Sequence, residues 1–299
     1  MFFIQESDKP SKVSKIFNIL KIDEDKIILP INEEKLELKK ASKLAIKTKK
    51  ILDLANCNKI RISKKIKEQP LYINYLNSYN IEIVDGKWLF EVLSYKIIEY
   101  ISKVKKIKKE ELSVSILINK ITETSLYNIR KIATSCKRVN IVTNHIELFK
   151  KLEKQILDED GIMITITNNK RKSLSKSNII LNIDFPQELI NQYNIFDEAI
   201  IVNIQGNIKI KKKRFNGMCV NDYEIQVLND EEFDYDKEIK YNKKDVYEAN
   251  MYKKQPMENI MRKIERDKVR IVDLLGENTT MQGFTVWTLT IMYKLLKLY

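Results

Sequence analysis

A strand–turn–helix segment in the middle of the chain has polar and bulky residues where phosphate binding would need glycines. Residues 113–119 (SVSILIN) form the apolar run of a buried strand, and Glu123–Cys136 has helical apolar spacing. The turn at 119–124 reads NKITET. In proteins that bind dinucleotides, glycines in this turn let the backbone approach a pyrophosphate. Because Lys120 and Ile121 put side chains into that space, we expect a conventional NAD(P) pose to clash.

The same edge of the predicted sheet nevertheless carries groups that can bind a cofactor. The N–H groups at the start of the helix can donate to a phosphate, and Thr122 or Thr124 can cap that helix. Two further strands are predicted at 139–143 and 179–183, and their carboxyl ends reach the same edge. The candidate cofactor-binding residues are Asn119, Thr122, Thr124, Asn144 and Asp184.

A basic, hydroxyl-rich connection at 168–178 is the second candidate site. It follows the predicted strand 162–167 and places serines among its cations. Ammonium and guanidinium groups bind phosphate through charge-assisted hydrogen bonds. The alternative interpretation is a solvated loop without a ligand. The candidate anion-binding residues are Lys170, Arg171, Lys172 and Lys176.

The remaining reactive residue types form no catalytic or metal-binding set. Cys57, Cys136 and Cys219 are far apart, and His145 is the single histidine, so a Cys/His zinc site lacks ligands. His145 follows a predicted strand end, where an acid–base residue can act, although an exposed residue at a helix start is the simpler interpretation. We therefore predict no metal site, assign no catalytic residue and leave open whether the chain is an enzyme.

These candidate residues need an α/β scaffold to bring them together. Near-continuous Ile and Val runs without alternation predict strands covered on both faces, as in a parallel sheet between helix layers. Five such strands alternate with helical segments, which predicts a doubly wound, Rossmann-like parallel sheet. The strands are expected at 113–119, 139–143, 162–167, 179–183 and 199–204, with 208–215 and 218–227 as a hairpin or edge strands.

The chain divides into three predicted regions. Residues 1–111 alternate strands and helices as a small N-terminal α/β domain that ends in one long helix, 87–107. Residues 112–228 form the Rossmann-like domain. Residues 229–299 begin as an acid-rich linker and continue as C-terminal helices. The last of these helices, 284–299, is apolar on much of its circumference, so it is expected to dock on its own chain, to form a homo-oligomer surface or to lie on a membrane surface.

Bulk composition bears on partners and location. The 299 residues include 54 Lys and Arg against 41 Asp and Glu, a formal net charge of +13. This charge invites binding to nucleic acid or an anionic surface, but Lys, Ile and Asn are common throughout the chain, which favours a compositional cause. No apolar stretch approaches the ~20 residues that span a bilayer, and the N-terminus does not have the pattern of a signal peptide. We expect a cytoplasmic protein with reduced thiols.

One segment of the predicted Rossmann-like domain resembles a known family group. Residues 177–186 (SNIILNIDFP) are similar to the fourth Rossmann strand of shikimate dehydrogenases and glutamyl-tRNA reductases, and 199–203 is similar to their next strand. The resemblance implies an N-terminal substrate domain, a Rossmann domain and helices that return to the first domain. It also implies NAD(P)-dependent oxidoreduction. The string Asn56-Cys57-Asn58-Lys59 resembles the sequence around the reductase nucleophile, but its surroundings do not match.

The departures from that pattern guide the functional prediction. The glycine turn is replaced, and Asn144 stands where relatives place the acid that binds an adenosine ribose. We therefore predict a binding or regulatory module that has lost the standard NAD(P) phosphate-binding turn. The alternatives are a functioning NAD(P)-dependent oxidoreductase with an atypical cofactor site, and a protein that binds nucleic acid or an anionic surface.

Overall fold

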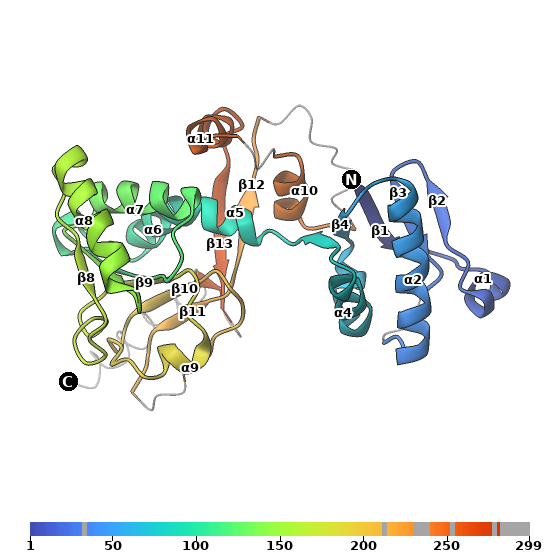
Figure 1. Cartoon of the computed structure of the whole chain (residues 1–299), viewed down its shortest axis with the longest axis horizontal. Helices are drawn as coiled ribbons and strands as arrows, with labels where there is room; N and C mark the ends of the chain where they lie inside the picture. Colours follow the sequence, from blue (N-terminus) through green and yellow to red (C-terminus); the bar gives the residue numbers. More distant parts are fainter. Residues whose placement is uncertain (32–34, 211–213, 230–239, 252–254, 277–279, 282–299) are drawn as a thin grey trace, which may run out of the picture. The chain divides into compact units, whose positions relative to one another are not determined.

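The computed structural model describes residues 1–31, 35–210, 214–229, 240–251, 255–276 and 280–281 (Figure 1). The chain forms two compact units. The first contains residues 1–86 and 230–254, and the second contains 87–229 and 255–299. The predicted domain boundaries at 111 and 228 stay a prediction. The spatial units divide the chain earlier, after Gly86, because the two helices that follow pack against the helix Glu123–Ser135 of the second unit.

The first unit is built on a five-stranded sheet in the order β2-β3-β1-β4-β5. All neighbouring strands run parallel except β2, which pairs antiparallel with β3 at the edge. The chain places β3 on one side of β1 and then crosses back to place β4 on the other side, so the winding direction reverses at β1. The strands are β1 (Phe2–Glu6), β2 (Lys21–Asp23), β3 (Lys26–Leu29), β4 (Lys59–Ile62) and β5 (Glu82–Val84).

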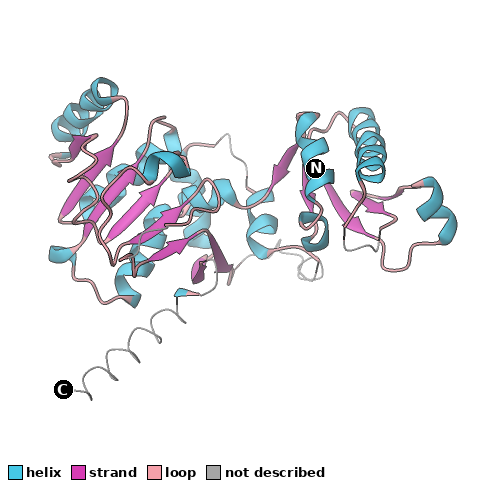
Figure 2. Cartoon of the chain, turned by 90° about the horizontal axis from the view of Figure 1, so that it is seen from below, coloured by secondary structure: helices cyan, strands magenta, loops and turns pink. Residues whose placement is uncertain are grey.

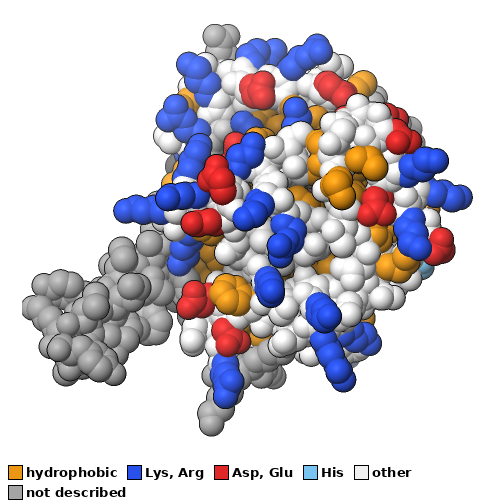
Figure 3. All heavy atoms as spheres, turned by 90° about the vertical axis from the view of Figure 1, so that its left-hand side faces the viewer, with side chains coloured by type: hydrophobic (Ala, Val, Ile, Leu, Met, Phe, Trp, Pro, Cys, Tyr) orange, Lys and Arg blue, Asp and Glu red, His pale blue; other side chains and the backbone are white. Residues whose placement is uncertain are grey.

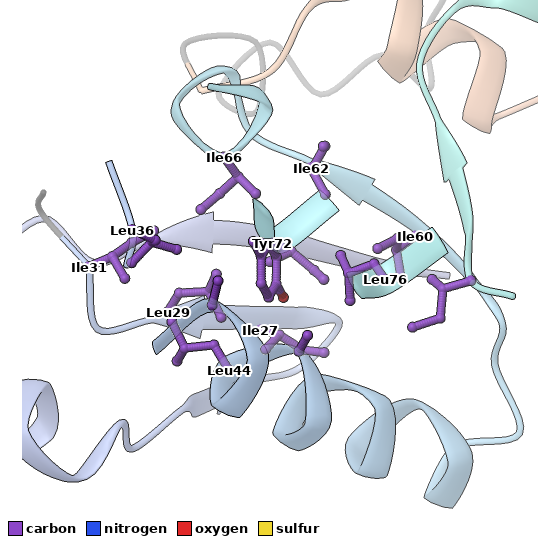
Figure 4. Packing of buried hydrophobic residues seen from close by; sticks show 14 of the residues in the cluster. Ile27, Leu29, Ile31, Leu36, Leu44, Ile60, Ile62, Ile66, Tyr72 and Leu76 are labelled. Carbon is purple, nitrogen blue, oxygen red and sulfur yellow. The ribbon is translucent and has the colours of Figure 1, made fainter. Parts of the chain in front are cut away.

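One face of this sheet is covered by two helices and holds the core of the first unit. Ile27 and Ile60 project from the strands toward Leu44 of α2 (Leu38–Leu54) and Tyr72 of α4 (Pro70–Ser78), and all four are fully buried (Figure 4). The Tyr72 hydroxyl lies 2.8 Å from Thr48 Oγ1, so the core satisfies its polar group. The short helices α1 (Lys12–Phe17) and α3 (Lys64–Lys67) follow β1 and β4.

The opposite face is covered by a segment from much later in the chain. Arg61 of β4 is completely buried there, and its Nη2 donates to the carbonyl oxygen of Val246 in α10 (Lys243–Ala249) at 3.0 Å. Its guanidinium lies 4.6 Å from the ring centroid of Phe3, and burial lowers its pKa to about 10. Lys67 forms an ion pair with the buried Asp245 at 2.5 Å. This helix therefore belongs to the core of the first unit.

The second unit contains a six-stranded sheet in which every neighbouring pair is parallel (Figure 2). Its order is β11-β10-β9-β6-β7-β8. Numbered within the unit, this reads 3-2-1-4-5-6 from the β8 edge, which is the Rossmann order. The predicted Rossmann-like α/β fold is confirmed. The strands are β6 (Ser113–Leu117), β7 (Arg138–Val142), β8 (Thr165–Thr167), β9 (Ile179–Asn182), β10 (Ile200–Asn203) and β11 (Met218–Val220).

Helices cover this sheet, and one face has a compact apolar cluster. Leu117, Ile180 and Phe185 are buried in that cluster, which α9 (Gln187–Ile190) and neighbouring loops enclose. The predicted helix 87–107 is two helices, because the chain breaks at Leu93. The other helical elements are α5 (Lys87–Val92), α6 (Ser94–Val104), a 3₁₀ turn (Lys109–Glu111), α7 (Glu123–Ser135), α8 (Ile146–Asp160) and α11 (Met257–Arg266).

The end of the second unit differs from the sequence prediction. β12 (Asp222–Gln226) pairs antiparallel with β13 (Arg270–Leu275), so the helical expectation for 245–299 is wrong at Arg270–Leu275. Of the two alternatives for 208–215 and 218–227, the hairpin is absent from the described residues. The edge-strand alternative is confirmed for β11, which joins the parallel sheet beside β10 at its edge. The apolar segment 284–299 and most of the acidic linker lie outside the described residues. Among the helices that the structure describes, none has both the length and the apolar character needed to cross a bilayer.

Candidate functional site

The carboxyl edge of the Rossmann sheet brings together the turn after β6 and the residue that follows β9. These strands are neighbours, with Leu117 opposite Asn182. The Asp184 carboxylate accepts hydrogen bonds from the N–H of Asn119 at 2.8 and 2.9 Å and from the N–H of Lys120 at 2.8 Å. These two N–H groups open the turn that precedes α7, whose own N-terminus begins at Glu123. An internal carboxylate therefore occupies the first two backbone donors of the turn.

A second acid faces the same turn from α5. The Thr122 hydroxyl donates to Glu91 Oε1 at 3.2 Å. Burial raises the pKa of Glu91, and the nearby charge of Asp184 raises it further, against the hydrogen bond from Thr122. The two carboxyl groups give this edge negative character. A pyrophosphate would meet like charge here.

Thr122 and Thr124 take part in helix packing. Thr122 is the N-cap of α7: its Oγ1 accepts from the N–H of Ser125 at 3.0 Å, and Ser125 Oγ accepts from the Thr122 N–H at 2.8 Å. This reciprocal pair satisfies two free N–H groups of the helix end. Thr124 is buried, and its hydroxyl lies 3.6 Å from the Met257 sulfur. The predicted capping role thus falls to Thr122, and Thr124 points into the contact with α11.

Asn119 links the turn to the end of the next strand. Its Oδ1 accepts from the N–H of Asn144 at 2.9 Å and lies 3.4 Å from Thr143 Oγ1. The structure thus joins three predicted site residues, Asn119, Asn144 and Asp184, in one network. Whether any of them binds a cofactor stays a prediction.

Lys120 and Ile121, the side chains expected to block a dinucleotide, are both exposed, and the expected clash stays a prediction. In addition, Asp184 already accepts from the N–H groups of Asn119 and Lys120. Asp184 is a ligand-binding candidate in the sequence, but its contact with the turn has no sequence signal. Glu91 is not among the candidates, because no local pattern distinguishes an acid within a helix.

The basic connection at 168–178 has an internally bonded backbone. Asn169 Oδ1 accepts from the N–H groups of Arg171 at 3.0 Å and Lys172 at 3.1 Å. Ser173 and Ser177 are buried against β6, where Ser115 Oγ donates to the Ser173 carbonyl at 3.0 Å and lies 2.7 Å from Ser177 Oγ. The serines therefore serve the fold. The four cationic candidates, Lys170, Arg171, Lys172 and Lys176, are exposed, and their anion-binding role stays a prediction.

Basic and acidic side chains are both present on the face of the second unit that Figure 3 shows, where Lys and Arg are spread with Asp and Glu between them. Nucleic-acid binding needs cations gathered along a phosphate track. Binding of nucleic acid stays a prediction.

The cysteines of the described chain lie apart from one another. Cys57, Cys136 and Cys219 are half-buried, and none forms a disulfide within the described residues. Burial raises the pKa of the Cys136 thiol to about 12, so it is protonated and unreactive at neutral pH. Within the described residues, no group of three or more His, Cys, Asp and Glu side chains could hold a metal ion.

Comparison with known proteins adds little to this description. No protein-family model and no curated protein matches the chain. L-tryptophan dehydrogenase from Nostoc punctiforme is 10% identical, with a TM-score of 0.30 over 71% of this chain and 65% of that one. Ornithine carbamoyltransferase from Pyrococcus furiosus is 12% identical, with a TM-score of 0.26 over 68% and 71%. A proposed D-3-phosphoglycerate dehydrogenase from Ralstonia solanacearum is 10% identical, with a TM-score of 0.36 over 95% and 97%.

These scores are too low to carry an argument about activity. The fold assignment rests on the order and direction of the six strands in the second unit.

Proposed function

We propose that the second unit is a binding or regulatory module in which an internal carboxylate replaces the dinucleotide phosphate. One observation carries this proposal: Asp184 accepts hydrogen bonds from the N–H groups of Asn119 and Lys120. A pyrophosphate could use these donors only after Asp184 had been displaced. Displacement costs the charge-assisted hydrogen bonds, and it leaves Asp184 and Glu91 close to the incoming anion.

The alternative is an NAD(P)-dependent oxidoreductase with an atypical cofactor site. The topological switch point of the Rossmann sheet, where Asn119 and Asp184 meet, favours it, because ligands of such sheets bind there. The resemblance of residues 177–186 to shikimate dehydrogenases and glutamyl-tRNA reductases also favours it. A cofactor in this chain would have to bind without the N–H groups of Asn119 and Lys120.

Thermal unfolding of the full chain with millimolar NAD, NADP and their reduced forms separates the two functions. A ligand that binds only the folded chain stabilises it by RT ln(1 + [L]/Kd). We expect no shift in Tm with any of the four. A concentration-dependent rise in Tm would instead support the oxidoreductase.

The variant Asp184→Ala sharpens this test, because it frees the N–H groups of Asn119 and Lys120. Inorganic pyrophosphate should then raise the Tm of the variant more than that of the wild-type chain. Asp158→Ala is the matched control, since it removes an exposed carboxylate from α8. An equal rise in Tm with pyrophosphate in all three proteins would show that Asp184 does not keep pyrophosphate from these N–H groups.

A further inference from the structure

The first unit has a pocket of about 350 Å³ at the carboxyl edge of its own sheet. The ends of β1 and β3, the connection from β1 to α1, the start of β2 and Lys240 line it. Ligands of doubly wound sheets bind outside the carboxyl ends of the strands, near the strand where the winding reverses. In this sheet that strand is β1. The volume is within the usual range for sites that hold small molecules.

Glu6, the last residue of β1, gives the pocket a fixed hydrogen-bond acceptor. Its side chain is largely buried, with the residue 7% exposed. Ser63, which follows β4, donates its hydroxyl to Glu6 Oε2 at 2.6 Å. Among the described residues, this hydroxyl is the side-chain partner of Glu6, no group donates to Oε1, and Glu6 lines the pocket. A carboxylate placed in this way favours a ligand that brings a hydrogen-bond donor.

The rim of the pocket supplies the opposite charge. Lys9 and Lys21 line it and are exposed, and neither forms an ion pair within the part of the chain that the structure describes. The third rim cation, Lys240, is already held by Asp8 at 2.9 Å. Two ammonium groups are therefore available for an anionic group of a ligand whose donor reaches Glu6.

We propose that this pocket binds a small organic acid that also carries an ammonium or hydroxyl donor. The acid group, a carboxylate or phosphate, pairs with Lys9 and Lys21, and the donor binds Glu6 Oε1. This recognition requires both groups in one molecule, because the acceptor ends β1, whereas the cations lie in the connection from β1 to α1 and at the start of β2. The inference uses the first unit alone and does not depend on the function proposed for the second.

Isothermal titration of the full chain tests the requirement for both groups. The bifunctional probes are serine, lactate and glycerol phosphate, each of which carries an acid group and a hydrogen-bond donor. The monofunctional probes are propionate, ethylamine and inorganic phosphate. Each of these lacks the acid, the donor or the carbon chain that joins them. At least one bifunctional probe should show saturable binding. Its Kd should be at least about tenfold lower than that of its monofunctional counterparts, because one charged hydrogen bond is worth about that factor. Absence of saturation by all three bifunctional probes, or equal binding by the monofunctional ones, overturns the proposal.

Substitutions then assign the binding to this pocket. Glu6→Gln keeps the shape of the side chain, and Lys9→Gln with Lys21→Gln removes two exposed charges without disturbing the core. Each variant should weaken the saturating probe about tenfold or more. Lys50→Gln on the exposed face of α2 is the matched control and should bind as the wild type does. If Glu6→Gln does not fold, the variant with both Lys9→Gln and Lys21→Gln tests the proposal. Unchanged binding of the probe by that variant overturns it.

Discussion

The two units place a carboxylate at the same kind of position and use it differently. Glu6 ends the central strand of the first sheet, and Asp184 follows a central strand of the second. Glu6 accepts a hydrogen bond from one hydroxyl and lines a pocket. Both carboxylate oxygens of Asp184 accept hydrogen bonds from backbone N–H groups of the neighbouring turn. The carboxyl edge of a doubly wound sheet is thus a binding site only where the chain has not already filled it.

The difference has an energetic basis. A carboxylate that accepts several N–H groups holds two loops together and stabilises the fold. A carboxylate with an unused oxygen keeps hydrogen-bonding capacity for a ligand, at some cost in desolvation. We therefore expect substitution of Asp184 to act mainly on stability and substitution of Glu6 to act mainly on binding.

The largest effect is expected for Asp184→Ala, which removes the acceptor for the N–H groups of Asn119 and Lys120. Loss of a charged acceptor with several donors should lower the free energy of unfolding by about 2–3 kcal/mol. Urea unfolding of the full chain, followed by circular dichroism, measures this change. Asp158→Ala should stay within about 0.5 kcal/mol of the wild type. A small change in the free energy of unfolding of Asp184→Ala would mean that water replaces the hydrogen bonds of Asp184 without loss of stability.

A smaller effect is expected in the first unit for Ser63→Ala. Its hydroxyl donates to Glu6 and also accepts from the N–H of Ile66 at 3.2 Å as the N-cap of α3. Removing this cap and donor should cost about 1–2 kcal/mol. Ser78→Ala, which removes only an exposed hydroxyl bonded to its own helix, is the control. The same urea unfolding experiment applies, and equal effects of the two substitutions would contradict the assigned role of Ser63.

The smallest effect is a pH dependence at the edge of the second unit. The pKa of Glu91 is raised in the folded chain, chiefly by burial, so the folded state binds its proton more tightly than the unfolded state does. The stability that this group contributes is complete below the unfolded pKa and is lost as pH rises through the folded pKa. Glu91→Gln should therefore flatten the fall in stability across that window and be more stable than the wild type at neutral pH.

Chemical unfolding at a series of pH values from acid to neutral checks this. Glu110→Gln, an exposed acid in the 3₁₀ turn, should leave the pH profile unchanged. A pH profile of Glu91→Gln that parallels the wild-type profile would show that Glu91 does not contribute to the pH dependence of stability.

Sequence patterns were sufficient where burial is uniform along an element. The continuous apolar runs of β6, β9 and β10 are buried at nearly every position, because helices or loops cover both faces of the sheet. This is why the parallel α/β fold was predictable. The patterns failed at Arg270–Leu275, where a short apolar run is compatible with a helix as well as a strand. They also failed at Leu93, where no proline or glycine marks the break in the helix.

What the sequence by itself determined is the scaffold: strand runs, a threonine cap for the helix that follows β6, and a turn without glycine. Only the tertiary structure decided what that turn does, because Asp184 lies 65 residues from Asn119 along the chain and meets it only when β9 pairs with β6. The same holds in the first unit, where Glu6 and Ser63 are separated by 57 residues. Local propensity extends over a few residues, whereas the partner of a carboxylate is set by which strands become neighbours.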